Sequence, residues 1–136
     1  MSHNPSQADH PVHSFLASFT AAWNANDLDN VRALLHPDLY AESHRSFTAL
    51  GSVRGSDAHE AVLSFHVAAP YCAFEVVETR PDGHAAGRFL LNDGGVAELE
   101  IPVVLHLVEG LLVQCATFDA SDVDDAVALL DEWATA

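Results

Sequence analysis

The apolar residues in the first half of the chain recur at helical spacing. A first helix is predicted from Val12 to about Asn24, with Pro11 in its first turn, and its apolar positions are Val12, Phe15, Leu16, Phe19 and Trp23. Asp27 can cap a second, short helix, which ends before Pro37 because the residue preceding a proline is pushed out of the helical region. The capping pair Ser56-Asp57 predicts a third helix over Ala58–Ala68.

The second half of the chain has the pattern of paired strands. Turn signals such as Asp82-Gly83 and Asp93-Gly94 separate the apolar runs, and the predicted strands are Leu39–Ser46, Tyr71–Thr79, His84–Leu91, Gly95–Val108 and Leu111–Asp119. Pro102 lies inside the longest run, and because proline cannot donate to a strand ladder it marks a bulge, a bend or an edge stretch. An acidic helix, Ser121–Trp133, closes the chain. The pattern predicts an α+β fold in which helices pack on a curved antiparallel sheet that encloses a pocket.

Length and composition favour one ordinary globular domain. The 136 residues are 49% hydrophobic, which is enough for a sizeable core, and we expect a flexible tail over residues 1–9 before a single domain over residues 10–136. The chain has no run of about 18 apolar residues and no signal-peptide pattern, so a cytoplasmic location is expected. Cys72 and Cys115 lack metal-ligand spacing and are expected to be buried thiols.

The charge balance excludes two classes of partner. Five arginines and no lysine face twenty acidic residues, which gives a formal net charge of −15. Such a surface repels phosphates and anionic lipid headgroups, so neither nucleic acid nor membrane is an expected partner. The nine histidines are scattered and form no zinc-type spacing, and no glycine-rich phosphate loop is present in the sequence, so we expect no metal and no cofactor.

Three short phrases resemble the NTF2-like superfamily, especially its SnoaL-like and ketosteroid-isomerase-like branches. They are AWNANDLD at residues 22–29, LHPD at residues 35–38, and EGLLVQCATFD at residues 109–119, and the resemblance covers residues 12–133. It implies a cone-shaped α+β fold, with three N-terminal helices packed on a curved, mostly antiparallel sheet and a C-terminal helix added. Members of this superfamily have a small-molecule pocket, and many pair through the outer face of the sheet.

The residues that carry ketosteroid isomerisation are missing at the matching positions. By motif register, the tyrosine donor falls at Phe19, the carboxylate base at Ser43 and the protonated acid at Pro102. Phenylalanine and proline have no side-chain donor, and a serine without a partner is no base. Steroid-type isomerisation is therefore not expected of this chain.

The same register predicts which side chains face the cavity. On the longest strand, alternation turns Glu98, Glu100, Pro102, Val104 and His106 inward and places Leu99, Ile101, Val103, Leu105 and Leu107 on the outer face. Because an apolar outer face must be covered, a homodimer through that face is predicted. The predicted ligand-binding residues are Phe19, Trp23, Ser43, Arg45, Leu63, Phe89, Val104, His106, Cys115 and Thr117.

Two hypotheses of function remain open. In the first, the protein is a pocket protein or dimerisation module without chemistry, whose cavity binds a small-molecule ligand or is filled by side chains. In the second, it is a cofactor-free isomerase, cyclase or hydratase, with Asp119 or Glu100 as the acid/base and Arg45 orienting a substrate oxygen. In that second case an apolar cavity should raise the pKa of Asp119. Each carboxylate also has a structural alternative, because Asp119 can cap the last helix and Glu100 can lie in water.

Overall fold

A computed structural model of the chain describes residues 10–46, 51–94 and 98–136. The predicted tail, residues 1–9, and the start of the longest predicted strand lie outside the described residues. The elements are, in order, α1 Pro11–Asn24, α2 Leu28–Ala33, β1 Leu35–Ser43, β2 Ser52–Arg54, α3 Ser56–Leu63, α4 Phe65–Ala68, β3 Tyr71–Arg80, β4 His84–Asn92, β5 Glu98–Val108, β6 Leu111–Thr117 and α5 Val123–Thr135.

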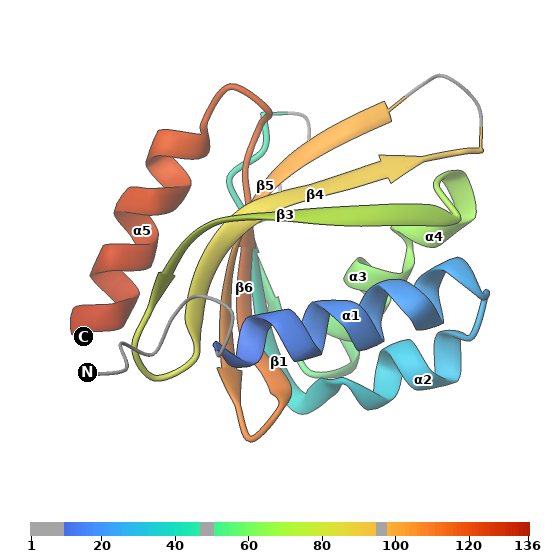
Figure 1. The fold of residues 1–136 in the computed structure, drawn as a ribbon, viewed down its shortest axis with the longest axis horizontal. Coiled ribbons are helices and arrows are strands. Elements are labelled where there is room, and N and C mark those ends of the chain that lie inside the picture. Colours follow the sequence, from blue (N-terminus) through green and yellow to red (C-terminus); the bar gives the residue numbers. More distant parts are fainter. Residues whose placement is uncertain (1–9, 47–50, 95–97) are drawn as a thin grey trace, which may run out of the picture.

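The six strands form one curved sheet in the order β2-β1-β6-β5-β4-β3. All neighbouring pairs are antiparallel except β1 and β6, which run parallel. Figure 1 shows α1 to α4 on one side of this sheet and α5 on the other. The predicted α+β architecture, with helices on a curved and mostly antiparallel sheet, is therefore confirmed.

The helices begin and end where the sequence signals lie. Pro11 occupies the first turn of α1, and the Asp27 side chain accepts from the backbone N–H of Asn30 to cap α2. The predicted third helix is instead two short helices, which meet at Ser64. The hydroxyl of Ser64 donates to the carbonyl of Ala61 (2.8 Å), a local bond of the kind that competes with the helix backbone.

Strand β1 begins four residues earlier than predicted, and β2 was not predicted at all. Pro37 lies inside β1, where the pairing with β6 shifts register between Leu35 and Tyr40. The short β2 pairs with β1 through Tyr40–Arg54 and Ala41–Val53. A three-residue strand between glycine-containing segments has too little periodicity to stand out in the sequence.

Pro102 lies within β5 in the interior of the sheet, with β4 and β6 on its two sides. Its side chain is fully buried, so the edge location that the sequence allowed does not apply. Pro102 cannot donate a backbone hydrogen bond, but its carbonyl accepts from the backbone N–H of Phe118 (2.9 Å). This bond ties the end of β6 to the middle of β5.

The predicted facing of β5 is wrong by one residue. Leu105 pairs with Cys115, and both pack with Phe19 in the large core cluster on the helix side of the sheet. Val104 belongs to a second cluster on the opposite face, where α5 covers it with Ala126 and Leu130. Because side chains alternate with a period of two, a one-residue error exchanges the two faces along the whole strand.

This exchange changes what covers the outer face. Val103 and Leu105, which were predicted to bury a dimer interface, are 4% and 6% exposed inside a single subunit. The C-terminal helix α5 packs over Ala86, Val104 and Ala116 on the outer face, so each chain covers much of that face itself. The homodimer stays a prediction, and the apolar row that motivated it lies in the core. Within the described residues, no helix has both the length and the apolar character needed to cross a membrane.

Candidate functional site

Two adjoining chambers lie between the sheet and the helices α1, α3 and α4. The inner chamber has a volume of about 60 Å³ and is lined by Phe15, Phe19, Val62, Phe65, Phe74, Phe89, Ile101, Val103, Leu105, Leu112, Cys115 and Thr117. The outer chamber has a volume of about 190 Å³ and is lined by Ala41, Glu42, Ser43, Arg45, Gly51, Ser52, Val53, Ala61, Val62, Ser64, Phe65, Cys115 and Thr117. Four residues line both chambers, namely Val62, Phe65, Cys115 and Thr117. These four therefore form the junction of one elongated pocket.

The inner chamber is walled by aromatic rings. Phe19 contacts Phe74 and Phe89 edge to face, with ring centroids 5.9 Å and 5.8 Å apart, and Phe74 stacks on Phe89 at 4.4 Å. Trp23 lies behind this wall, stacked on Phe19 at 5.5 Å, and its indole N–H donates to the carbonyl of Ala69 (3.0 Å). Edge-to-face and offset-stacked rings hold one another in place, so the chamber is a preformed apolar cavity.

The outer chamber carries the polar groups, and Arg45 is its cation. The guanidinium carbon of Arg45 lies 5.5 Å from the centre of the Phe65 ring, within the range of a cation–π contact. Ser43, Ser52, Ser64 and Thr117 contribute hydroxyl groups to the same lining. The Ser43 hydroxyl accepts from the backbone N–H of Arg45 (3.3 Å), which turns the chain at the end of β1.

Glu42 is the acidic residue that lines the outer chamber. Its carboxylate contacts Nε2 of His44 at 2.6 Å. The His44 ring in turn stacks on Phe118, with centroids 4.5 Å apart, on the α5 side of the sheet. The Glu42 carboxylate is therefore held by a partner that packs on the outer face.

Cys115 lies at the junction of the two chambers. Burial, with a smaller contribution from the negative charge of Glu42, raises the pKa of the Cys115 thiol to about 12. The thiol is therefore protonated at neutral pH and serves as a small apolar wall residue.

Asp119 does not lie in a dry cavity, contrary to the prediction. Its carboxylate accepts hydrogen bonds from the backbone N–H of Ser46 (3.1 Å) and from the Ser46 hydroxyl. These bonds, with a smaller contribution from the charge of Arg45, lower the pKa of Asp119. The predicted rise in the pKa of Asp119 was therefore wrong, because hydrogen bonds to the charged form outweigh desolvation there.

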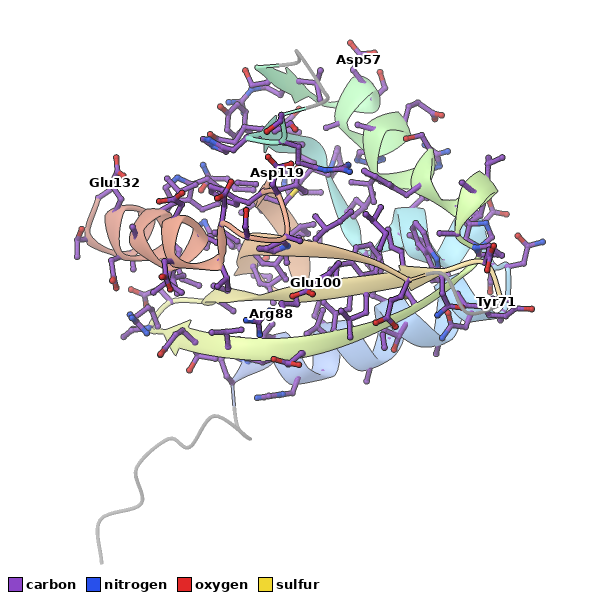
Figure 2. The ribbon with its side chains drawn as sticks, turned by 90° about the horizontal axis from the view of Figure 1, so that it is seen from above. Asp57, Tyr71, Arg88, Glu100, Asp119 and Glu132 are labelled. Atoms are coloured by element: carbon purple, nitrogen blue, oxygen red, sulfur yellow. The ribbon has the colours of Figure 1, made fainter. Side chains whose placement is uncertain are left out.

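Glu100 lies on the outer face of the sheet, where it forms an ion pair with Arg88 (2.7 Å). Arg88 also forms an ion pair with Glu75 (2.6 Å). Figure 2 shows Glu100 and Arg88 over the long strands and Asp119 apart from both. The inward placement of Glu100 was wrong for the same one-residue reason as that of Val104. The two carboxylates proposed as acid/base groups therefore do not meet.

The other predicted site residues divide into two groups. The structure brings Phe19, Ser43, Arg45, Phe89, Cys115 and Thr117 together as pocket lining, with Trp23 and Leu63 in the core around it. His106 lies on the outer face, where its ring stacks on His84 at 3.9 Å and its Nδ1 contacts the Gln114 side chain at 3.2 Å. Val104 lies beneath α5.

Sequence reasoning placed Leu63 of α3 at the pocket but missed Val62 on the same helix and the contributions of α4 and β2. Val62 and Phe65 form part of the junction, and Ser52 and Val53 line the outer chamber from β2. Ile101, Val103 and Leu105 of β5 also line the inner chamber, although the sequence analysis placed them on the outer face. Among the described residues, no group of three or more histidine, cysteine or acidic residues could hold a metal ion.

No protein-family model and no curated protein matches this chain. Solved structures do match it. An NTF2-like protein of unknown function from Shewanella oneidensis superimposes with a TM-score of 0.62 at 15% identity, covering 80% of this chain and 97% of that one. A Mycobacterium tuberculosis protein in complex with estradiol-17beta-hemisuccinate has a TM-score of 0.58 at 21% identity, covering 79% and 92%.

A third match is TerC co-crystallised with polyporic acid, with a TM-score of 0.58 at 16% identity, covering 87% of this chain and 98% of that one. Identities this low establish the fold and leave the activity open. They agree with the curved sheet and with the helices α1 to α4 that pack on one side of it, so the fold that the resemblance implied is confirmed. This chain has the NTF2-like fold.

Proposed function

We propose that this protein binds a small, largely apolar molecule in the cone without transforming it. The observation that carries the proposal is the pair of adjoining chambers, of about 190 and 60 Å³, which share four lining residues. A preformed, mostly apolar cavity with a few polar groups at one end is the usual form of a small-molecule site. The fold neighbours that hold estradiol-17beta-hemisuccinate and polyporic acid support the proposal by analogy of fold.

The surroundings of the carboxylates favour binding over catalysis. A general acid or base for an apolar substrate needs a carboxyl group beside the reacting atom, with its pKa raised toward neutrality. The pKa of Asp119 is lowered instead, and Glu100 lies on the other face of the sheet. Glu42, the acidic residue of the outer lining, is engaged with His44. The described residues of the inner chamber include no carboxylate.

The test is to fill the junction and measure binding of a neutral probe. Phenylbutanol has a phenyl group for the inner chamber and a hydroxyl for the outer one. Val62→Phe adds a ring at the junction of the two chambers, whereas Val67→Phe makes the same exchange on α4 at a position that is 90% exposed. Isothermal titration calorimetry should give a dissociation constant of about a millimolar or tighter for the wild type and Val67→Phe.

Val62→Phe should weaken phenylbutanol binding at least tenfold, because the added ring occupies the space that the ligand needs. Circular dichroism and thermal unfolding of both variants check that each is folded. The absence of binding to the wild type at the solubility limit of phenylbutanol would refute the proposal. Equal affinity of the two folded variants would place the ligand elsewhere and refute it as well.

A further inference from the structure

We infer that the pocket selects an amphiphilic organic anion, whose carboxylate contacts Arg45 and whose apolar end enters the aromatic inner chamber. This inference rests on the proposed binding function and names the chemical class of its ligand. It follows from three features of the structure, which are the polarity of the two chambers, the position of Arg45, and the absence of any other lysine or arginine from the described lining.

The polarity of the pocket changes along its length. The inner chamber is lined almost wholly by apolar side chains, and its hydroxyl-bearing residue, Thr117, lies at the junction. The outer chamber adds hydroxyl groups and the guanidinium of Arg45. A molecule that matches both chambers therefore has one apolar end and one polar end. The polar end has to be one that a guanidinium stabilises.

Arg45 suits the recognition of a carboxylate. Guanidinium presents N–H donors in a planar fork that matches the two oxygens of a carboxylate, and it keeps its charge at every physiological pH. Arg45 is half-buried at the end of β1, and its guanidinium lies over the Phe65 ring, which also lines both chambers. The contact with Phe65 holds the guanidinium beside the junction of the two chambers. An anion bound to Arg45 can therefore extend its apolar end into the inner chamber.

The other four arginines line neither chamber. Three of them form ion pairs with carboxylates, namely Arg32 with Glu60, Arg80 with Glu78 and Asp131, and Arg88 with Glu75 and Glu100. The fourth, Arg54, is exposed on β2, where it stacks over Tyr40 at 4.9 Å and does not line either chamber. Since the chain has no lysine, Arg45 supplies the positive side-chain charge of the pocket lining.

The net charge of −15 opposes an anionic ligand at long range but not within the pocket. Exposed charges are screened over about 8 Å at physiological ionic strength, so the local field of Arg45 dominates at its own guanidinium. The charge of Arg45 contributes to lowering the pKa of Asp119, whose oxygens accept from Ser46. The negative charge of Asp119 therefore weakens the attraction between Arg45 and an anion. Replacing Asp119 by a neutral residue should strengthen binding of the anion.

The test compares three probes of matched size that differ in one end group: phenylbutyrate, phenylbutanol and phenylbutylamine. Isothermal titration calorimetry measures each probe against the wild type, Arg45→Gln and Asp119→Asn. Arg54→Gln is the matched control, because it removes an arginine with the same kind of ring contact outside the pocket. The wild type should bind the acid at least tenfold more tightly than the alcohol, and the amine most weakly.

Arg45→Gln should remove the preference for the acid and leave the affinity for the alcohol within about twofold, since charge-assisted hydrogen bonds are the stronger ones. Asp119→Asn should strengthen binding of the acid, and Arg54→Gln should change nothing. If the wild type binds the alcohol as well as the acid, or if Arg54→Gln acts like Arg45→Gln, the ligand class inferred here is wrong while the pocket function stands. If no probe binds, both the ligand class and the pocket function are refuted.

Discussion

Leu130 on α5 offers a direct test of how the outer face of the sheet is covered. Its side chain is fully buried and packs in a small cluster with Ala86, Val104, Ala116 and Phe118 on the outer face. This cluster is separate from the large core, so the helix–sheet contact can be perturbed without touching the pocket. Leu130→Ala removes the largest aliphatic side chain of α5 that is completely excluded from water.

The expected loss follows from the burial of Leu130. Truncation of a fully buried leucine to alanine costs about 2–5 kcal/mol, from lost transfer free energy and from the cavity left behind. Because the strands beneath Leu130 cannot move easily into the cavity left by the substitution, we expect the free energy of unfolding to fall by about 3 kcal/mol or more. For a domain of this size that corresponds to a fall in melting temperature of roughly 10 °C. Leu129→Ala, at a half-buried position of the same helix, should cost about 1 kcal/mol.

Urea denaturation followed by circular dichroism measures both variants, with the slope of the transition checking that each remains two-state. A loss below about 1 kcal/mol for Leu130→Ala would refute the reasoning, because a fully buried leucine in a packed cluster cannot be that dispensable. Equal losses for Leu129→Ala and Leu130→Ala would also refute it. Either result would mean that α5 does not hold the position on the sheet described above.

Two further predictions concern titrating groups near the pocket. The pKa of Asp119 is lowered below its ordinary 3.8 in the folded state, so its contribution to stability is present above that value and disappears as the pH falls through the folded pKa. Asp119→Asn should therefore be less stable than the wild type in urea at about pH 6, and the gap should close at low pH; a gap that persists in acid would contradict this account. Burial raises the pKa of the Cys115 thiol from 9.0 to about 12, so iodoacetamide at about pH 8 should label it roughly a thousandfold more slowly than a free thiol of ordinary pKa until the protein is unfolded in urea. Rapid labelling of Cys115 in the native protein would show that water reaches the junction of the chambers.

Much of the fold is legible in the sequence because local physics specifies it. The helical spacing of Phe15, Phe19 and Trp23 requires an amphipathic helix, and Pro11 and Asp27 act as start signals within their own turns. Turns at Asp82-Gly83 and Glu109-Gly110 need positive φ angles, which glycine adopts readily. These features involve neighbours in the chain, so no tertiary information is needed to read them.

The lining of the pocket could be predicted only in part from the sequence, because it depends on which face of each strand points toward the pocket. Cys115 and Thr117 on β6, Ser43 on β1 and Arg45 just after β1 were assigned to the pocket side, and the parallel pairing of β1 with β6 brings them together. On β5 the alternation is clear, but its two possible phases differ by one residue, and the family resemblance implies the phase that the structure contradicts. Nothing local separates the two phases.

The tertiary structure decided that phase through long-range packing. On one side of the sheet Ile101 and Leu105 pack with the aromatic residues Phe15 and Phe19 of α1, and on the other side α5 covers Val104. Both faces of β5 are apolar in this part of the strand, so polarity alone could not assign them, and only the docking of two helices far apart in the sequence could. For the same reason the sequence by itself placed Arg45 at the pocket, whereas the packing of helices on both faces of the sheet determined that Glu100 lies outside it.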